Sequence, residues 1–455
     1  MAHVLAIVRS GETRTLTSAP YSLMTYVPRN IGEAADEVEE QITIEVSRTS
    51  ITDLQTDIQR LERLFSHADE YNQLQYGTKS WRVRLKFQPD GYADAYYADI
   101  VRGRIEIATP TNWLNAPWAT KKMRLNLIIT RKNYWEAASD GGITITNPNG
   151  TGDGTTGLRI DNCNDAGGSP ARCNYVDIAS TIVGGTLPAP LYFTLLTNKN
   201  DAKLVNKVWV GMYREANTGL ANSGWSLELD DISEGTKTAD AACSGAYYRA
   251  LTWSATVETK IATLTFTGAQ WALFSRQIWR LLLRLQAVHG YSDLWLKARL
   301  KMGSIVLDET PWVLTGAADQ IMDLGMMKIT PMYISTGAER PVSIEIYAKK
   351  TSAAAYALNA DYLTFLPATF GCAVYQIGSG VPYYLQLVDD PYNDRLYSGD
   401  STGYGVDVTR LGGTLFVRPS TAHKLVFHVQ CTDGTAEIDR NSLIYLRYYQ
   451  RRIML

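Results

Sequence analysis

The sequence predicts a mainly β protein, and three observations lead to that prediction. Apolar and polar residues alternate with a period of two in many short segments, which is the pattern of a strand with one buried face. Stretches rich in Gly, Asn, Asp and Thr separate these segments, as turns would. The aromatic residues comprise 27 Tyr and 11 Trp against 9 Phe, and Tyr and Trp favour strands. Because both rings also carry a polar group, the same bias is typical of a wet contact surface.

Composition and charge exclude several classes of protein. A length of 455 residues suggests about three domains. The 44 Lys and Arg nearly balance the 46 Asp and Glu, so we expect no specific nucleic-acid binding. The apolar run at residues 278–285 is interrupted by Arg280 and Arg284, so we expect no membrane insertion. The run at residues 4–8 lacks a basic leader and is interpreted as a first strand, not a signal peptide. We therefore expect a soluble protein made in the cytoplasm.

Residues 1–136 are predicted to form a first domain, a β unit with one helix. Alternating segments lie at residues 42–47, 81–87 and 123–129. In the first of these, Ile42, Ile44 and Val46 share one face while polar residues occupy the other. A strand of this kind buries one face and leaves the other in water.

The helix is predicted near residues 52–69, where Thr52 and Gln55 fit a capping box. Apolar residues recur there at steps of four and three, which marks a single apolar stripe. We expect the stripe to lie on a sheet and the opposite face, which begins with Asp57, to lie in water. The stripe consists of Leu54, Ile58, Leu61, Phe65 and Ala68.

Residues 137–351 are predicted to form a jelly-roll β-sandwich, because short apolar runs follow one another at a spacing that suits two packed sheets. Residues 279–285 fit either a strand or a helix, and the alternation of Trp295, Lys297 and Arg299 after them favours strands. Residues 352–455 are predicted as a C-terminal β segment. This segment is either a domain of its own or the closing strands of the sandwich.

Two glycine motifs occur without the context that their chemistry needs. Gly152, Gly154 and Gly157 satisfy the dinucleotide pattern, but the residues that follow resemble a strand, not the helix that binds a pyrophosphate. Residues 399–403 satisfy the pattern around a hydrolase serine, Ser401, with Asp407 and then His423 or His428 later in the chain. The strand before that serine and the helix after it are missing, which favours a solvated loop. We predict no cofactor.

Acidic and amide residues cluster at three places, and each is more typical of a turn than of a site. The clusters could in principle seat a glycosidase pair or a Ca²⁺ ion. They comprise Glu228, Asp230 and Asp231; Asp389, Asp390 and Asp394; and Asp161, Asn162, Asn164 and Asp165.

His423 and His428 are expected on opposite faces of a strand, so they would not share a metal. Cys163 and Cys173 are spaced so that they could form a disulfide or remain free thiols. We predict no enzyme, and no catalytic, cofactor-binding or metal site; a jelly-roll hydrolase with paired carboxylates is kept as a further alternative.

The order of elements in residues 1–136 resembles the tail-tube and distal-tail-protein fold of long-tailed bacteriophages. In that fold two packed sheets flanked by a helix form one subunit of a ring. The resemblance rests on the strand Ile42–Val46, the helix through Leu54 and Phe65, and the strands at 81–87 and 123–129, the last ending in residues 131–135.

The resemblance implies a structural protein of the virion tail that assembles into a homo-oligomeric ring or tube beside other tail proteins, with no cofactor. Segments at 174–178, 188–190 and 323–325 look like the jelly-roll modules that such proteins carry as decorations. The position in the tail and the symmetry stay open.

The alternative is a carbohydrate-binding β-sandwich for attachment to a host surface, in which exposed Trp and Tyr stack on sugar rings of a host glycan.

A cluster at the C-terminus would suit a contact between subunits, since interfaces are enriched in Tyr and Arg. An ordinary final strand explains it equally well. The cluster comprises Tyr445, Arg447, Tyr448, Tyr449, Arg451 and Arg452.

Overall fold

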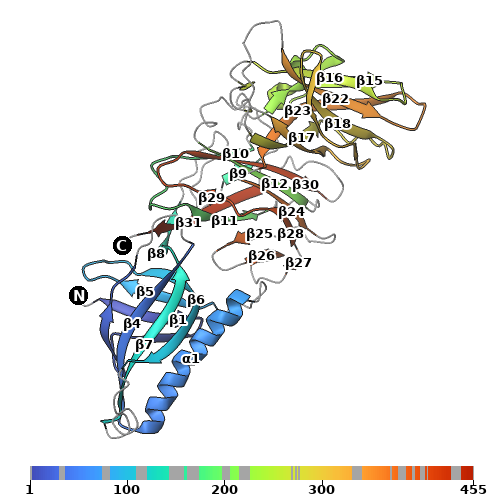
Figure 1. Cartoon of the computed structure of the whole chain (residues 1–455). Helices are drawn as coiled ribbons and strands as arrows, with labels where there is room; N and C mark the ends of the chain where they lie inside the picture. The colour runs from blue at the N-terminus through green and yellow to red at the C-terminus, as the bar shows by residue number, and fades with distance from the viewer. Residues whose placement is uncertain are drawn as a thin grey trace. The chain divides into compact units, whose positions relative to one another are not determined.

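The computed structural model divides the chain into two compact units. Unit 1 comprises residues 1–141, 184–189 and 449–455, and unit 2 comprises residues 142–183 and 190–448. The prediction of a mainly β protein is confirmed, since strands dominate both units (Figure 1). The described residues are 3–29, 36–73, 82–108, 120–142, 158–160, 174–196, 205–214, 226–267, 270–271, 274, 277–329, 341–368, 371–377, 386–391, 395–399, 405–406, 408–431 and 442–453.

Unit 1 contains two antiparallel sheets that share strand β6. One sheet has the order β2-β1-β5-β6-β8 and the other the order β3-β4-β7-β6. The first part of β6 pairs with β5 and β8, and the rest pairs with β7. The strands are β1 (Val4–Arg9), β2 (Glu12–Thr15), β3 (Tyr21–Tyr26), β4 (Glu37–Ser47), β5 (Arg84–Gln88), β6 (Tyr96–Ile107), β7 (Lys122–Lys132) and β8 (Trp135–Gly142).

Strand β4 has the predicted alternation. Ile42, Ile44 and Val46 are fully buried, while the residues between them face outward. The apolar run at residues 4–8 is the first strand, as predicted. Trp81, at the start of one predicted strand, lies outside the described residues, and β5 begins at Arg84.

Helix α1 (Ile51–Gln73) begins one residue earlier than predicted, and this changes its cap. The Ser50 hydroxyl accepts a hydrogen bond from the Asp53 amide at 3.0 Å and donates one to the Asp53 carboxylate at 2.7 Å. The predicted capping box of Thr52 and Gln55 is therefore wrong. Thr52 already lies in the first turn, whereas an N-cap residue must precede the helix.

The predicted stripe of α1 packs on the sheets, with Leu54, Leu61, Phe65 and Ala68 buried. Phe65 lies directly over Gly103 of β6: a Cβ added at Gly103 would lie 2.4 Å from Phe65 Cδ1. A glycine at this position therefore lets the helix approach the strand closely. The absence of a side chain there is a requirement of packing and not of backbone conformation.

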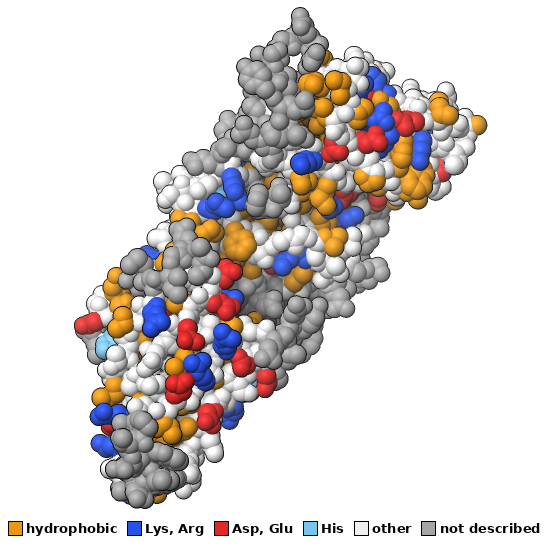
Figure 2. Space-filling model, viewed as in Figure 1, with side chains coloured by type: hydrophobic (Ala, Val, Ile, Leu, Met, Phe, Trp, Pro, Cys, Tyr) orange, Lys and Arg blue, Asp and Glu red, His pale blue; other side chains and the backbone are white. Residues whose placement is uncertain are grey.

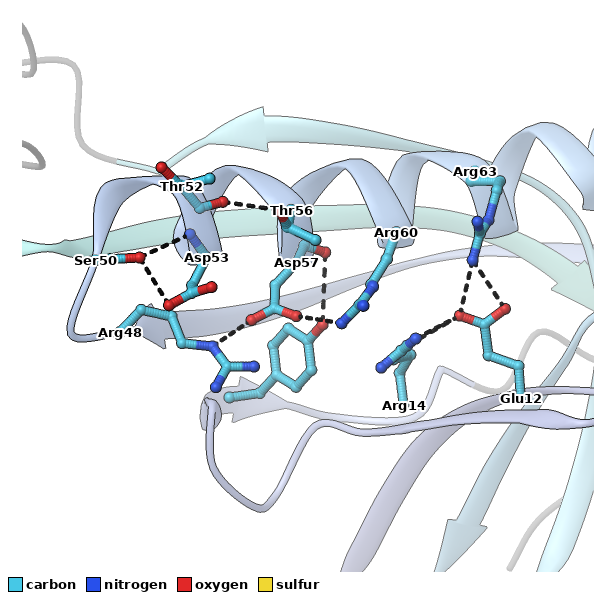
Figure 3. A network of polar contacts seen from close by, with 11 residues as sticks. Glu12, Arg14, Arg48, Ser50, Thr52, Asp53, Thr56, Asp57, Arg60 and Arg63 are labelled. Carbon is cyan, nitrogen blue, oxygen red and sulfur yellow. Dashed lines mark hydrogen bonds and ion pairs between the residues drawn. The ribbon is translucent and has the colours of Figure 1, made fainter.

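Asp57 does not lie in water, and that expectation is wrong. Its side chain is 2% exposed and pairs with Arg48 at 2.5 Å and with Arg60 at 3.3 Å. Further along the helix, Arg63 pairs with Glu12 of β2 at 3.3 Å (Figure 3). The helical period alone placed Asp57 on the polar face, but Arg48, nine residues earlier, turns back to pair with it.

The described strands of unit 2 form two sandwiches of antiparallel sheets. In the first sandwich, Phe193 of β11 contacts Tyr375 and Phe427 of the facing sheet. Its sheets have the orders β31-β11-β25-β26-β27 and β10-β30-β12-β24-β28. The strands are β9 (Leu158–Ile160), β10 (Tyr175–Ile178), β11 (Ala189–Leu196), β12 (Val205–Arg214), β24 (Cys372–Ile377), β25 (Gln386–Asp390), β26 (Arg395–Gly399), β27 (Gly405–Val406), β28 (Val408–Gly412), β29 (Phe416–Val417), β30 (His423–Cys431) and β31 (Ser442–Arg452).

The second sandwich encloses a large apolar core between the sheets β14-β15-β23-β17-β21 and β16-β22-β18-β19. Residues 277–285 form strand β17, which settles the choice between helix and strand. The strands are β13 (Ser226–Glu228), β14 (Thr236–Ala239), β15 (Tyr247–Trp253), β16 (Thr259–Thr265), β17 (Gln277–Leu285), β18 (Trp295–Met302), β19 (Ile305–Glu309), β20 (Val313–Leu314), β21 (Ile321–Ile329), β22 (Val342–Lys349) and β23 (Tyr356–Pro367).

Strands from residues 352–455 pair with strands from much earlier in the chain. β23 pairs with β13, β15 and β17, while β24 and β30 both pair with β12. The end of β31 enters unit 1, where the Arg451 side chain pairs with Glu136 of β8. The chain therefore leaves unit 1 after β8 and returns to it twice, at residues 184–189 and 449–455.

Candidate functional site

One face of the four-stranded sheet β16-β22-β18-β19 carries cations and aromatic rings side by side. Even-numbered residues of β18 and β22, such as Leu296, Leu300, Ile344 and Ile346, are fully buried in the core. Because side chains alternate along a strand, the odd-numbered residues occupy the outward face. Trp312, just before β20, lies beside two of them, Lys297 and Lys349. We call this surface the cation–aromatic face, and it consists of Trp295, Lys297, Arg299, Lys301, Trp312, Glu345, Tyr347 and Lys349. Figure 2 shows hydrophobic, basic and acidic side chains gathered together over the region of these strands.

The register of β18 and β22 creates this arrangement. Trp295 lies opposite Lys349, and Lys297 lies opposite Tyr347. The Lys349 ammonium lies 4.5 Å from the ring centroid of Trp312 and 5.2 Å from that of Trp295. Contacts between a cation and a ring face at such distances stabilise by about 0.5–2 kcal/mol each.

Carboxylates neutralise most cations of this face. Lys297 and Arg299 each pair with both Glu258 and Glu309, at 2.9–3.2 Å. The hydrogen bond from Arg299 is the main reason that the pKa of Glu309 is lowered. Lys349 differs, because its described contacts are with the two indole rings and no described carboxylate pairs with it.

A second polar cluster is buried between β13, β17 and β23. Asp361 is fully buried, forms an ion pair with Arg284, and accepts hydrogen bonds from the Ser244 amide at 3.1 and 3.2 Å. The Ser244 hydroxyl donates to Glu228 Oε1 at 2.9 Å. Glu228 Oε2 is buried and has no hydrogen-bond partner among the described residues. Burial, reinforced by the nearby Asp361 charge, raises the pKa of Glu228 to about 8.

Most of the described residues of the predicted acidic clusters have partners within the chain. Asp230 pairs with Lys237 at 2.7 Å, Glu228 accepts a hydrogen bond from the Ser244 hydroxyl, and Asp231 is exposed. Asp389 pairs with Arg410 at 2.9 Å. Within the part of the chain that the structure describes, no group of three or more His, Cys, Asp or Glu could hold a metal ion.

His423 and His428 have separate hydrogen-bond partners. His428 lies within 3.3 Å of the Tyr362 hydroxyl and 3.4 Å of the Asn174 amide. His423 Nε2 accepts a hydrogen bond from the Arg418 amide at 2.9 Å. Burial lowers the pKa of His423 to about 4 and that of His428 to about 3, so both are neutral at pH 7.

Several predicted features lie outside the described residues. These are the glycines of the dinucleotide pattern, Ser401 and Asp407 of the hydrolase pattern, and the loop that holds Cys163 and Cys173. Asp394 and the oxygen-rich loop with Asp161, Asn162, Asn164 and Asp165 also belong to this group. A strand, β26, does end at Gly399, so the expectation that no strand precedes Ser401 is wrong.

The C-terminal cluster of Tyr and Arg makes contacts within its own chain. The Tyr448 hydroxyl donates to the Ile182 carbonyl at 2.8 Å, and its side chain is buried. The Arg451 guanidinium lies 3.9 Å from the ring centroid of Tyr134 and bonds to Glu136. These two residues therefore behave as parts of an ordinary final strand.

Sequence reasoning missed Lys349 and Trp312 as members of one cluster. The alternation in residues 342–349 carried a usable signal, because polar residues occupy every odd position there. No pattern in the neighbouring residues indicated that Trp312, which directly precedes β20, would lie beside Lys349 of β22.

None of the helices in the described part of the chain is long and apolar enough to cross a membrane.

Comparisons with known proteins identify no family. No family model matches the chain, and no curated protein matches it. Among solved structures, the chain is similar to the VP2 subviral particle of infectious bursal disease virus, with 8% identity and a TM-score of 0.17. It is also similar to the structure of the Gt strain of that virus, with 9% identity and a TM-score of 0.14. Each alignment covers 59% of this chain and 66% of the other. A likeness this weak carries no argument about fold or function.

Proposed function

We propose that this protein is a structural subunit of a bacteriophage virion tail that assembles with copies of itself into a ring or tube, with unit 2 as a decoration. The observation that supports this most is the architecture of unit 1. It consists of two sheets sharing β6 with α1 packed on them, which is the arrangement that the resemblance to tail-tube and distal tail proteins implies.

The edge of unit 1 offers a surface on which another copy can pack. Strand β3 pairs with β4 on one side and has no partner strand on the other among the described residues. Met24 within β3 and Val27 just after it are 47% and 72% exposed. The pairing with β4 is irregular between Leu23 and Thr25, and such bulges discourage uncontrolled strand addition at an edge. Since strand addition is discouraged, we expect another copy to pack against the exposed side chains of Met24 and Val27.

The outward face of β4 and β7 also suits close packing of copies. Glu37 pairs with Lys132 at 2.8 Å and Glu45 pairs with Arg124 at 3.2 Å, so charges on neighbouring strands neutralise each other. Figure 2 shows basic and acidic side chains mixed over unit 1. A balanced surface lowers the repulsion that a large net charge would create between subunits.

Electron microscopy and light scattering of the purified full-length protein test the proposal. We expect rings or tubes at micromolar concentration. Val27→Asp should weaken assembly, because it places a carboxylate in the apolar contact. Val257→Asp is the matched control, since Val257 in unit 2 is similarly exposed at 69%, and it should assemble as the wild type does. A strictly monomeric wild type would refute the proposal.

A further inference from the structure

The cation–aromatic face contains one subset of residues in which a cation contacts aromatic rings and has no described carboxylate partner. Trp295 lies opposite Leu314 of β20 on one side and opposite Lys349 of β22 on the other. Leu314 is 49% exposed, and Trp295, Trp312 and Lys349 are half-buried. Two indoles, an isobutyl group and an ammonium therefore share one open surface. We call it the Trp–Lys cluster.

The charge around the cluster is locally positive. The five cations Lys260, Lys297, Arg299, Lys301 and Lys349 face the four carboxylates Glu234, Glu258, Glu309 and Glu345, although the whole chain has a net charge of -2. Every one of these carboxylates is already paired with a cation. Lys349 is therefore the cation of the face that is open to an outside anion.

The main chain of β18 and β22 under the cluster is already paired on both sides. β22 pairs with β16 and β18, while β18 pairs with β22 on one side and with β19 and β20 on the other. A peptide that binds by extending a sheet needs free amides and carbonyls at an edge. At β18 and β22 a partner is therefore recognised by ring stacking, apolar contact and charge.

We propose that the Trp–Lys cluster binds a sugar that carries a carboxylate group. The C–H face of the sugar ring packs on the exposed indole and Leu314 surface, and the carboxylate pairs with the Lys349 ammonium. A charged hydrogen bond of this kind adds orientation as well as affinity. The inference rests on unit 2 alone and stands independently of the assembly proposed for unit 1.

Binding of defined saccharides to the full-length protein tests the inference. The probes are 3′-sialyllactose and tetragalacturonic acid, which present a carboxylate on two different sugars, and lactose as the neutral control. We expect at least one of the acidic probes to bind in titration calorimetry, more weakly at higher salt, and lactose to bind at least tenfold more weakly.

Substitutions then assign the site. Lys349→Met keeps the alkyl chain and removes the charge, so the affinity should fall at least tenfold, whereas Lys349→Arg should retain it. Trp312→Leu should also lose binding. Lys237→Met is the matched control, because Lys237 likewise lies over a ring, that of Tyr247 at 4.4 Å, but is paired with Asp230; it should bind as the wild type does.

Three results would overturn the inference. The first is that neither acidic probe binds at millimolar concentration. The second is that Lys349→Met, with a native circular dichroism spectrum, binds the acidic probe as tightly as the wild type. The third is that lactose binds as tightly as the acidic probes. If a tetraglutamate peptide binds as tightly and displaces the sugar, the cluster recognises acidic peptides and the sugar assignment is wrong.

Discussion

The contact between Gly103 and Phe65 predicts whether Gly103→Ala raises or lowers the stability of unit 1, and this tests the packing of α1. Gly103 does not have a left-handed backbone conformation, so replacing it by Ala would ordinarily stabilise the protein by about 0.4–1 kcal/mol. Here the new Cβ would lie 2.4 Å from Phe65 Cδ1 and 2.7 Å from Cγ. Phe65 is 3% exposed and cannot swing into water. The ring must retreat by about 1 Å, and overpacking of this kind costs about 1–3 kcal/mol.

Gly103→Ala should therefore destabilise unit 1, and removing the ring should cancel the effect. The measurement is urea unfolding followed by the far-UV helical signal, for which α1 is the longest contributor. In a Phe65→Leu background, Gly103→Ala should be neutral or stabilising. The effects of the two substitutions on the free energy of unfolding should therefore differ from additivity by at least about 1 kcal/mol. Gly413→Ala is the control, because nothing lies within 4 Å of its added Cβ. An increase in stability on Gly103→Ala, or an equal loss in both backgrounds, would refute the reasoning.

Two further predictions concern buried charges. Because the folded-state pKa of Glu228, about 8, exceeds the ordinary value of 4.5, the protonated carboxyl contributes stability that is present at pH 4.5 and is lost as the pH rises toward 8. Glu228→Gln should thus match the wild type near pH 5 and exceed its unfolding free energy near pH 9; a lower value at the higher pH would contradict this. Arg451→Met should destabilise unit 1 by about 2–3 kcal/mol in chemical denaturation, because it leaves buried Glu136 with only Arg82, 3.8 Å away. A loss below about 0.5 kcal/mol would mean that Arg82 suffices.

The parts of the fold that could be predicted are those that depend on neighbouring residues. The period of two in β4 and the period of 3.6 in α1 are local, and both were found within a few residues. Ser50 and Asp53 satisfy the same local capping pattern as Thr52 and Gln55. Local pattern alone could not choose between these two pairs, since both precede the same apolar stripe.

The features that escaped prediction depend on partners far away in the chain. Asp57 is buried because Arg48 and Arg60 reach it, and Arg284 is buried because Asp361 lies 77 residues later on the neighbouring strand. A charged residue in isolation is expected in water, since burial of a charge is costly without a partner. The Trp–Lys cluster escaped for the same reason, because Trp312 and Lys349 meet only through tertiary structure.

The return of the chain to unit 1 has a consequence for biosynthesis. Residues 184–189 and 449–455 belong to unit 1, and Arg451 reaches Glu136 only after unit 2 has been translated. Domains generally fold as their residues leave the ribosome, the earliest first. Unit 1 differs in that it also includes residues 184–189 and 449–455, which are translated later than its first 141 residues. The core of unit 1 is itself built from residues between Leu5 and Ala137, so the Arg451–Glu136 ion pair is a late addition to a core whose residues are already synthesised.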